Sequence, residues 1–237
     1  MIYGSKSRIG LIVPSNNTVI EPELYYIAPK GISFHFTKLL IDMPIPNSNI
    51  RDLEGESVTI LQHSGVDLIV YACMSTSISD SDQWEKEVTK KTGISATTAS
   101  NSIKSALKAV NCSSLALVCH YPAAELAPIV DWLESQSLSV TKVETANVHD
   151  QQEVCNIPVE EVYKMAERAN SDVADAICIL GTDLRTFPII DEIEKSIKKP
   201  VISSNLAILW SALKLSGKEE QIAGHGSLLS SLGRSKQ

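Results

Sequence analysis

Residues 67–77, DLIVYACMSTS, place a cysteine where an apolar strand pattern ends and hydroxyl side chains begin. The run at 68–72 is apolar throughout, which is typical of a strand in a parallel sheet covered on both faces. A similar pattern returns at residues 175–185, DAICILGTDLR, where Gly181 takes the place of the cysteine. From the residues alone, Cys73 is either a small buried side chain at a strand end or a nucleophile whose thiolate backbone amides stabilise.

The repeat extends beyond these two stretches and divides the chain. Residues 91–110, KTGISATTASNSIKSALKAV, match residues 198–215, KKPVISSNLAILWSALKL. Each contains a short strand pattern, a pair of hydroxyl residues and a helix with the letters SALK. We therefore expect two related α/β halves: residues 1–111, joined by a C-terminal helix at about 206–237, and residues 112–205.

Strand patterns alternate with helical patterns along the whole chain, which indicates parallel sheets built from βαβ units. The expected strands are 8–15, 32–40, 66–73, 94–100, 114–121, 138–146, 174–182 and 200–205. We expect a loop after Cys73 and a helix over 206–217. The predicted fold class is therefore α/β, with two pseudo-symmetric Rossmann-like parallel-sheet domains and an active site between them.

Composition excludes several classes of protein. The chain has 237 residues, of which 43% are apolar and 21% charged, as in ordinary soluble proteins. The formal net charge of -7 argues against a nucleic-acid partner. No run reaches the roughly 18 to 20 apolar residues of a membrane helix, and the N-terminal residues lack the apolar stretch of a signal peptide. We expect a cytoplasmic protein.

The cysteines do not form a metal site or a disulfide framework. There are five, an odd number, and none of their spacings matches a C-x-x-C or zinc pattern. A cytoplasmic chain keeps its thiols reduced. Cys119 and Cys178 lie inside apolar strand patterns, whereas Cys73 stands at a strand end. We expect no metal, and Cys73 is the candidate for chemistry.

Polar segments follow most of the predicted strands. Ligands in open parallel α/β sheets bind beyond the carboxyl ends of the strands, so these segments are expected to converge on one cleft between the halves. They are rich in hydroxyl and amide side chains and carry little charge, which suits the binding of carboxylate oxygens. The segments are PSNNT (14–18), ACMSTS (72–77), TTAS (97–100), HYP (120–122), GTDLRT (181–186) and SSN (203–205).

Several motifs resemble one family over nearly the whole chain. They are RIGLIVPSNNTVIEPEL (8–24), YACMSTS (71–77), TGISATTASNSIKSALKAV (92–110), TDLRT (182–186), PVISSNLAILWSALKLSG (200–217) and GHGSLL (224–229). In this order they resemble the maleate cis-trans isomerases of the aspartate/glutamate racemase superfamily, which includes arylmalonate decarboxylase. The resemblance implies two pseudo-symmetric α/β domains, an interdomain site, no organic cofactor or metal, and a homo-oligomer (dimer or tetramer).

The resemblance also implies roles for individual residues. Cys73 matches the first-half nucleophilic cysteine, Asn17 an asparagine that contacts substrate, and Tyr121 a tyrosine that contacts a carboxylate. Together with the polar strand ends, this predicts a set of substrate-binding residues. The set is Asn17, Ser75, Thr76, Tyr121, Gln151, Gly181, Thr182, Ser204 and Asn205.

The sequence departs from the family pattern in its second half. The second catalytic cysteine of the isomerases falls on Gly181, Asp183 replaces an asparagine, and Gln151 replaces another. Arylmalonate decarboxylases also have one catalytic cysteine, but theirs matches the second-half position. The chain therefore keeps one thiol of two, in the mirror arrangement.

A single thiol leaves several functions open. The first is cis-trans isomerisation of maleate or a related ene-dicarboxylate: Cys73 adds to the double bond, the resulting single bond rotates, and the thiolate is eliminated. The second is decarboxylation of a malonate-type acid, with Cys73 as a one-sided proton donor. The third is an amino-acid racemase-like or non-catalytic carboxylate-binding homologue, although racemisation needs a donor on each face, which Gly181 disfavours.

Other candidates have plain structural alternatives. Asn17 is also suited to an Asx-turn or helix cap, and Tyr121 to packing at a strand end. Asp183 is suited to capping the next segment or pairing with Arg185. His120 is suited to orienting Tyr121; it or Asp183 is also a candidate for the missing second proton donor.

Overall fold

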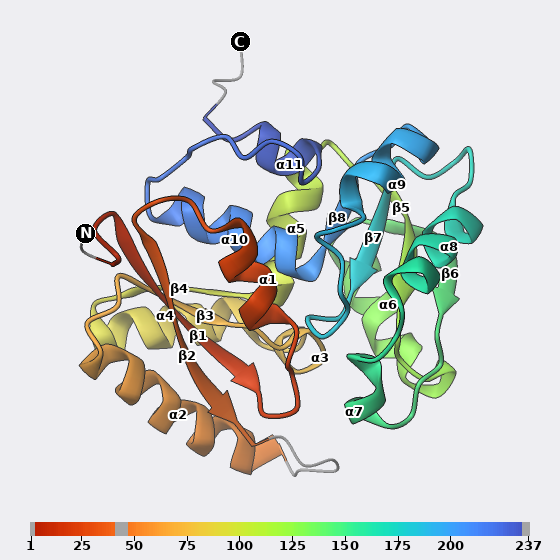
Figure 1. The fold of residues 1–237 in the computed structure, drawn as a ribbon. Coiled ribbons are helices and arrows are strands. Elements are labelled where there is room, and N and C mark those ends of the chain that lie inside the picture. Colours follow the sequence, from red (N-terminus) through yellow and green to blue (C-terminus); the bar gives the residue numbers. More distant parts are fainter. Residues whose placement is uncertain (1–2, 41–46, 234–237) are drawn as a thin grey trace.

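The structure is a computed structural model that describes residues 3–40 and 47–233, with side chains described outside 47–53. It contains two four-stranded sheets in which every strand pair is parallel (Figure 1). The first sheet has the order β2-β1-β3-β4 and the second the order β6-β5-β7-β8. The strands are β1 (Ser7–Pro14), β2 (Ile32–Leu39), β3 (Leu68–Tyr71), β4 (Ser95–Thr98), β5 (Ser114–Cys119), β6 (Ser139–Thr145), β7 (Ala176–Leu180) and β8 (Val201–Ser203).

Helices follow the strands and cover both sheets. They are α1 (Ile20–Ile27), α2 (Asn47–His63), α3 (Met74–Ser77), α4 (Ser81–Thr92), α5 (Ala99–Ala109), α6 (Leu126–Ser135), α7 (Gln151–Val154), α8 (Val159–Ala169), α9 (Ile190–Ile197), α10 (Ser204–Leu215) and α11 (Ser227–Ser230), with a 3-10 turn at Ala123–Glu125. None of these described helices has the length and apolar character needed to cross a membrane.

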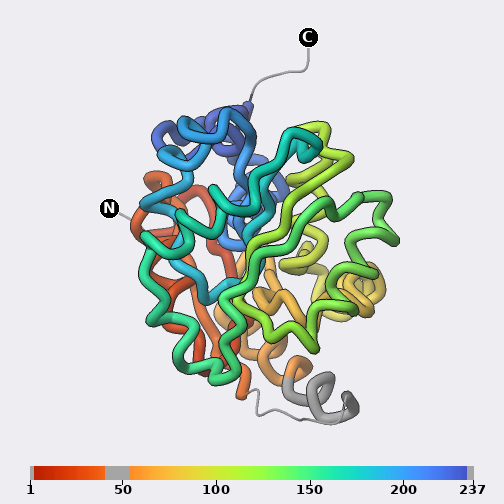
Figure 2. The backbone as a smooth tube through the Cα atoms, turned by 90° about the vertical axis from the view of Figure 1, so that its right-hand side faces the viewer, coloured from red at the N-terminus to blue at the C-terminus, as the bar shows by residue number. Residues whose placement is uncertain are grey.

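Helices α5 and α10 pack against each other between the two sheets (Figure 1). Residues 204–213 of α10 are all buried, as expected for a helix that is apolar on most of its faces. Helices α2 and α4 contact the first sheet, and α6 and α8 contact the second. Figure 2 shows the second half from its outer side, with the first half behind it.

The predicted α/β class and all eight expected strands are confirmed, with several local corrections, two of which bear on the site. The last strand ends at Ser203, and Ser204 and Asn205 open helix α10, because the Ser203 hydroxyl accepts a hydrogen bond from the Leu206 N–H and caps the helix. The expected loop after Cys73 is instead the short helix α3.

The two sheets draw their strands from the two predicted halves. The first sheet spans residues 7–98 and the second spans residues 114–203. The boundary at residue 111 and the grouping of 206–237 with the first half stay predictions. Residues 1–2, 41–46 and 234–237, which those bounds include, lie outside the described residues.

A buried carboxyl group joins the two halves. Glu23, on α1, is 8% exposed and accepts hydrogen bonds from the backbone N–H groups of Thr186 and Phe187 at 2.5 and 3.0 Å. It also accepts from the Asn205 side chain at 2.9 Å. Burial raises the pKa of Glu23, and these hydrogen bonds offset only part of the rise. The Glu23 carboxyl group therefore links the loop after β7 to both α1 and α10.

Replacing Glu23 tests this join. Glu23→Ala leaves two backbone N–H groups and an amide without their acceptor, so we expect the free energy of unfolding to fall by about 3 kcal/mol or more. Glu23→Gln keeps an acceptor oxygen and is expected to cost less. Urea unfolding of the three proteins measures both effects.

The same variants test the raised pKa of Glu23. A folded-state pKa above the unfolded value of 4.5 makes the folded state hold the proton more tightly. The resulting stabilisation is complete below pH 4.5 and is lost as the pH rises through the folded-state pKa. Relative to Glu23→Gln, the wild type should therefore lose stability as the pH rises from 4.5. A wild type that instead gains stability over the variant would show that the Glu23 pKa is lowered.

Candidate active site

Strand alternation places Cys73 on one face of the first sheet. Successive side chains of a strand point to opposite faces, and Ile69, Tyr71 and Cys73 share a hydrophobic cluster with Val58 of α2 and Val88 of α4. Cys73 lies just beyond the end of β3 and is 6% exposed. The thiol therefore lies at the carboxyl end of the sheet, on the side covered by α2 and α4.

Hydroxyl groups of α3 surround the Cys73 sulfur. The Ser75 Oγ lies 3.9 Å from Sγ, and Thr76 contacts the thiol through its hydroxyl and its backbone N–H. Burial raises the pKa of Cys73, these three hydrogen bonds lower it, and the charge of Asp183 raises it further. The net effect is that the pKa of Cys73 is raised. The Thr76 backbone N–H stabilises the thiolate, as suggested for an amide at a strand end, but burial outweighs its effect.

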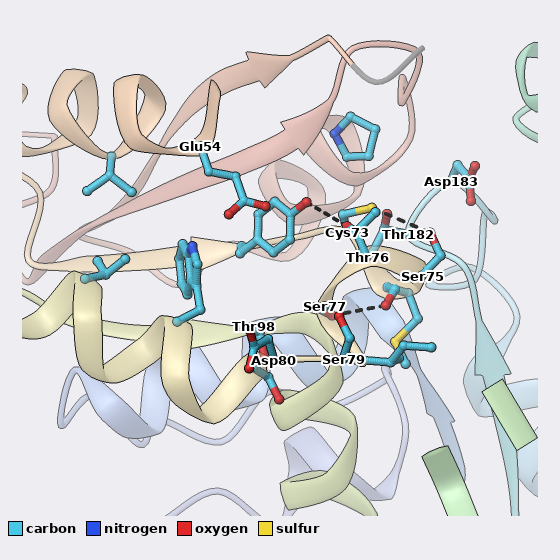
Figure 3. Close-up of a pocket in the computed structure, with 18 of the residues that line it drawn as sticks. Glu54, Cys73, Ser75, Thr76, Ser77, Ser79, Asp80, Thr98, Thr182 and Asp183 are labelled. Carbon is cyan, nitrogen blue, oxygen red and sulfur yellow. Dashed lines mark hydrogen bonds between the residues drawn. The ribbon is translucent and has the colours of Figure 1, made fainter. Parts of the chain in front are cut away.

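A cavity of about 950 Å³ opens beside Cys73 (Figure 3). Figure 3 shows Cys73 next to Thr76, with Thr182 and Asp183 on the adjoining loop of the second half. Both halves therefore contribute to the cavity. The predicted site residues that line it are Cys73, Ser75, Thr76, Tyr121, Gln151 and Thr182.

Asn17 lies behind the cavity wall. Its side-chain oxygen accepts hydrogen bonds from the N–H groups of Val19 and Ile20, at 2.9 and 3.1 Å, in an Asx-type turn before α1. Its amide donates to the Thr182 Oγ1 at 2.9 Å, and that hydroxyl donates to the Ala72 carbonyl at 3.2 Å. Asn17 therefore positions Thr182 beside the residue that precedes Cys73.

Gly181, Ser204 and Asn205 also lie outside the cavity lining and support the same loop. The Gly181 N–H donates to the Ser204 Oγ at 3.1 Å, and the Asn205 side chain donates to the Thr182 carbonyl at 3.1 Å. Ser204 and Asn205 are both buried. Their contacts hold the backbone from which Thr182 and Asp183 project.

Sequence reasoning missed several residues of the cavity wall, among them Asn16, Tyr71 and Trp84. Asn16 lines the cavity in place of Asn17, and its amide donates to the Gln151 Oε1 across the two halves at 3.3 Å. Tyr71 and Trp84 form an aromatic wall, with ring centroids 5.5 Å apart. The adjacent asparagines of PSNNT were a signal for Asn16, whereas Trp84 looked like an ordinary helix residue.

His120 and Asp183 form a pair at the second-half side of the cavity. The His120 Nε2 lies 3.3 Å from the Asp183 Oδ1, with the two side chains 7% and 15% exposed. Arg185, one of the two structural partners suggested for Asp183, donates to the Ile157 carbonyl at 2.9 Å. The His120 ring also packs on the Tyr121 ring, with centroids 4.1 Å apart. Burial, helped by the charge of Asp183, raises the pKa of Tyr121 well above its usual value, so its phenol stays protonated.

The charges around the cavity are mostly negative. Its described lining includes four acidic residues and one lysine: Glu54, Asp80, Glu87, Asp183 and Lys91. Hydroxyl and amide groups therefore supply most of the donors that an anionic ligand would meet. In the part of the chain that the structure describes, no three His, Cys, Asp or Glu side chains gather to hold a metal ion.

Comparison of the chain with known proteins identifies its family. A family model described as arylmalonate decarboxylase matches residues 9–229, which is most of the chain. The chain belongs to the arylmalonate decarboxylase family. Among its relatives, the maleate isomerase of Alcaligenes faecalis is 23% identical over 94% of this chain and 96% of its own length.

Solved structures of this family share the fold. A cysteine-to-serine mutant of the Nocardia farcinica maleate cis-trans isomerase, described with a covalently bound succinylcysteine intermediate, has a TM-score of 0.87 and is 24% identical. The superposition covers 94% of this chain and 98% of the Nocardia farcinica chain. Unliganded arylmalonate decarboxylase has a TM-score of 0.83 and is 22% identical over 94% of this chain and 98% of its own. Both confirm the two-sheet architecture.

The raised pKa of Cys73 should make its thiol less reactive at neutral pH than that of an exposed cysteine. Because only the thiolate is nucleophilic, we expect iodoacetamide at pH 7 to alkylate the partly exposed Cys155 before Cys73. Asp183→Asn removes one cause of the raised Cys73 pKa and should speed alkylation of Cys73 at the same pH. Peptide mapping by mass spectrometry gives both rates. Faster labelling of Cys73 than of Cys155 in the wild type would contradict the upward direction.

Proposed function

We propose that the protein catalyses cis-trans isomerisation of maleate, or a related ene-dicarboxylate, through a covalent adduct on Cys73. The observation that carries this proposal is the placement of Cys73 at the carboxyl end of β3, in a cavity built by both halves. The relatives named maleate isomerase, and the succinylcysteine described for the Nocardia farcinica enzyme, support the same chemistry.

Neutral donors around Cys73 are proposed to hold the two carboxylates. Ser75 and Thr76 lie on the first-half side and Tyr121 on the second-half side. The Thr182 hydroxyl is not counted among these donors, because it already donates to the Ala72 carbonyl. A hydroxyl donor can stabilise negative charge that builds up on a carboxylate when the sulfur adds to the neighbouring double bond. The amides of Asn16 and Gln151 close one side of the same space.

Asn17, Gly181, Ser204 and Asn205 are proposed to act indirectly, by positioning Thr182 and the loop around it. The cytoplasmic location and the homo-oligomeric state implied by the family resemblance stay predictions.

Turnover of maleate tests the main proposal. We expect proton NMR to show fumarate accumulating in the presence of the wild-type protein. Cys73→Ser replaces the nucleophile and should retain less than about one-thousandth of the rate. Cys155→Ser is the matched control and should keep the full rate, since Cys155 lies outside the cavity lining. A folded wild type that binds maleate without forming fumarate would point to a non-catalytic carboxylate-binding protein.

One observation favours a second candidate, the decarboxylation of malonate-type acids. The cavity is near the upper end of the roughly 300 to 1,000 Å³ found for small-molecule sites. Its aromatic wall of Tyr71 and Trp84 offers a surface for an aryl substituent. In this reaction the Cys73 thiol would protonate the enediolate left by loss of carbon dioxide.

Phenylmalonate distinguishes the two candidates. If the protein is a decarboxylase, carbon dioxide release from phenylmalonate should exceed fumarate formation from maleate at equal concentrations, and Trp84→Ala should raise the KM for phenylmalonate. If it is an isomerase, we expect fumarate formation and no carbon dioxide above the uncatalysed rate.

A further inference from the structure

The position equivalent to Cys73 in the second half has no side chain. Cys73 follows β3 and Gly181 follows β7, and these strands hold the same place in the order of their sheets. Addition of a thiol across a double bond delivers sulfur to one carbon and a proton to the other. A succinyl adduct carries that added proton, so a proton donor must reach the second carbon.

The space beside Gly181 is filled by His120. A Cβ placed on Gly181 would lie 2.7 Å from the His120 Cδ2, 3.1 Å from its Nε2 and 3.2 Å from the Asp183 Oδ1. The Gly181 φ of 131° is also one that side chains rarely allow. A side chain at 181 and the imidazole in its present position exclude each other. The imidazole thus occupies the place where a second thiol would begin.

The imidazole is fixed in this place from two sides. Asp183 holds its Nε2 edge at 3.3 Å, and Tyr121 packs against its face. The Nδ1 is buried and has no hydrogen-bond partner among the described residues. His120 and Asp183 both line the cavity with Cys73. An imidazole can both accept and donate a proton, so this placement gives the cavity an acid–base group opposite Cys73.

We propose that His120, positioned by Asp183, transfers the proton to and from the substrate carbon adjacent to the one that Cys73 attacks, in place of a second thiol. This inference rests on the proposed isomerase function and adds a second catalytic residue to it. His120 contributes the acid–base group, and Asp183 acts through His120 as a positioning residue.

The proposed reaction needs no further reactant, because each proton and electron pair moves between Cys73, His120 and the substrate. The Cys73 proton passes to His120 as the sulfur–carbon bond forms, and the double-bond electrons move onto the adjacent carbon. That carbon takes the proton from the imidazolium, and the carbon–carbon single bond rotates. His120 then removes a proton from the same carbon, the double bond re-forms, and the sulfur–carbon bond breaks. The departing thiolate regains its proton from the imidazolium.

His120→Ala tests the proposal with a chemical rescue. We expect the kcat for maleate to fall by about 10² to 10⁴-fold, and added imidazole to restore part of it. Pyrazole has the same ring shape but is a much weaker base, so it should fill the space without restoring turnover. His63→Ala alters an exposed histidine at the end of α2 and should leave kcat unchanged.

Two further variants guard against a merely structural effect. His120→Gln keeps a polar side chain of similar length and should lose kcat to a similar extent while its thermal unfolding midpoint stays near that of the wild type. Asp183→Asn should lower kcat but leave KM unchanged or lower, because it removes a negative charge close to a dianionic substrate. A disturbed cavity would raise KM instead.

These outcomes distinguish the proposed isomerase function from the proposed role of His120. Absence of maleate turnover in the wild type overturns the proposed function and this inference together. Turnover in the wild type with unchanged kcat in folded His120→Ala or His120→Gln overturns the role of His120 alone. Equal rescue by imidazole and pyrazole also overturns it, since it would show that His120 only fills space.

Discussion

Buried hydrogen bonds hold the loop after β7 against the first half of the chain. The Thr182 hydroxyl lies between the Asn17 amide and the Ala72 carbonyl, and the Glu23 carboxyl accepts from two N–H groups farther along the loop. An unpaired buried donor costs about 1 to 3 kcal/mol, so this loop has few alternative positions. Burial is the main cause of the raised pKa of the Cys73 thiol, and the same contacts bring Asp183 close enough to add to the rise. The candidate site therefore depends on this attachment.

The two halves share a topology but present different chemistry at equivalent positions. The first half offers a thiol surrounded by hydroxyl groups, and the second offers an imidazole paired with a carboxylate over a glycine. This difference is steric as well as chemical, since the His120 ring and a side chain at 181 cannot both occupy the space. The second half therefore presents an imidazole and a carboxylate to the cavity where the first half presents a thiol.

The repeat and the strand patterns were enough to predict the fold class, because period and order determine parallel sheets. They also pointed to Cys73, since position at a strand end follows from the pattern alone. Three features were not predictable in this way. Asn16 rather than Asn17 faces the cavity because an Asx-type turn directs Asn17 inward. The Cys73 pKa depends on burial, and the His120 position depends on how closely the ends of β5 and β7 approach each other, and both are tertiary properties.

A crystal structure of the wild-type protein soaked with maleate tests whether Cys73 and His120 act on adjacent carbons of one substrate. We expect continuous density from the Cys73 Sγ to one central carbon, with the next carbon about 3 to 3.5 Å from a nitrogen of the His120 imidazole, as expected for a geometry ready to react. Maleate bound with its double bond away from Cys73, or an adduct whose second carbon faces away from His120, would contradict it.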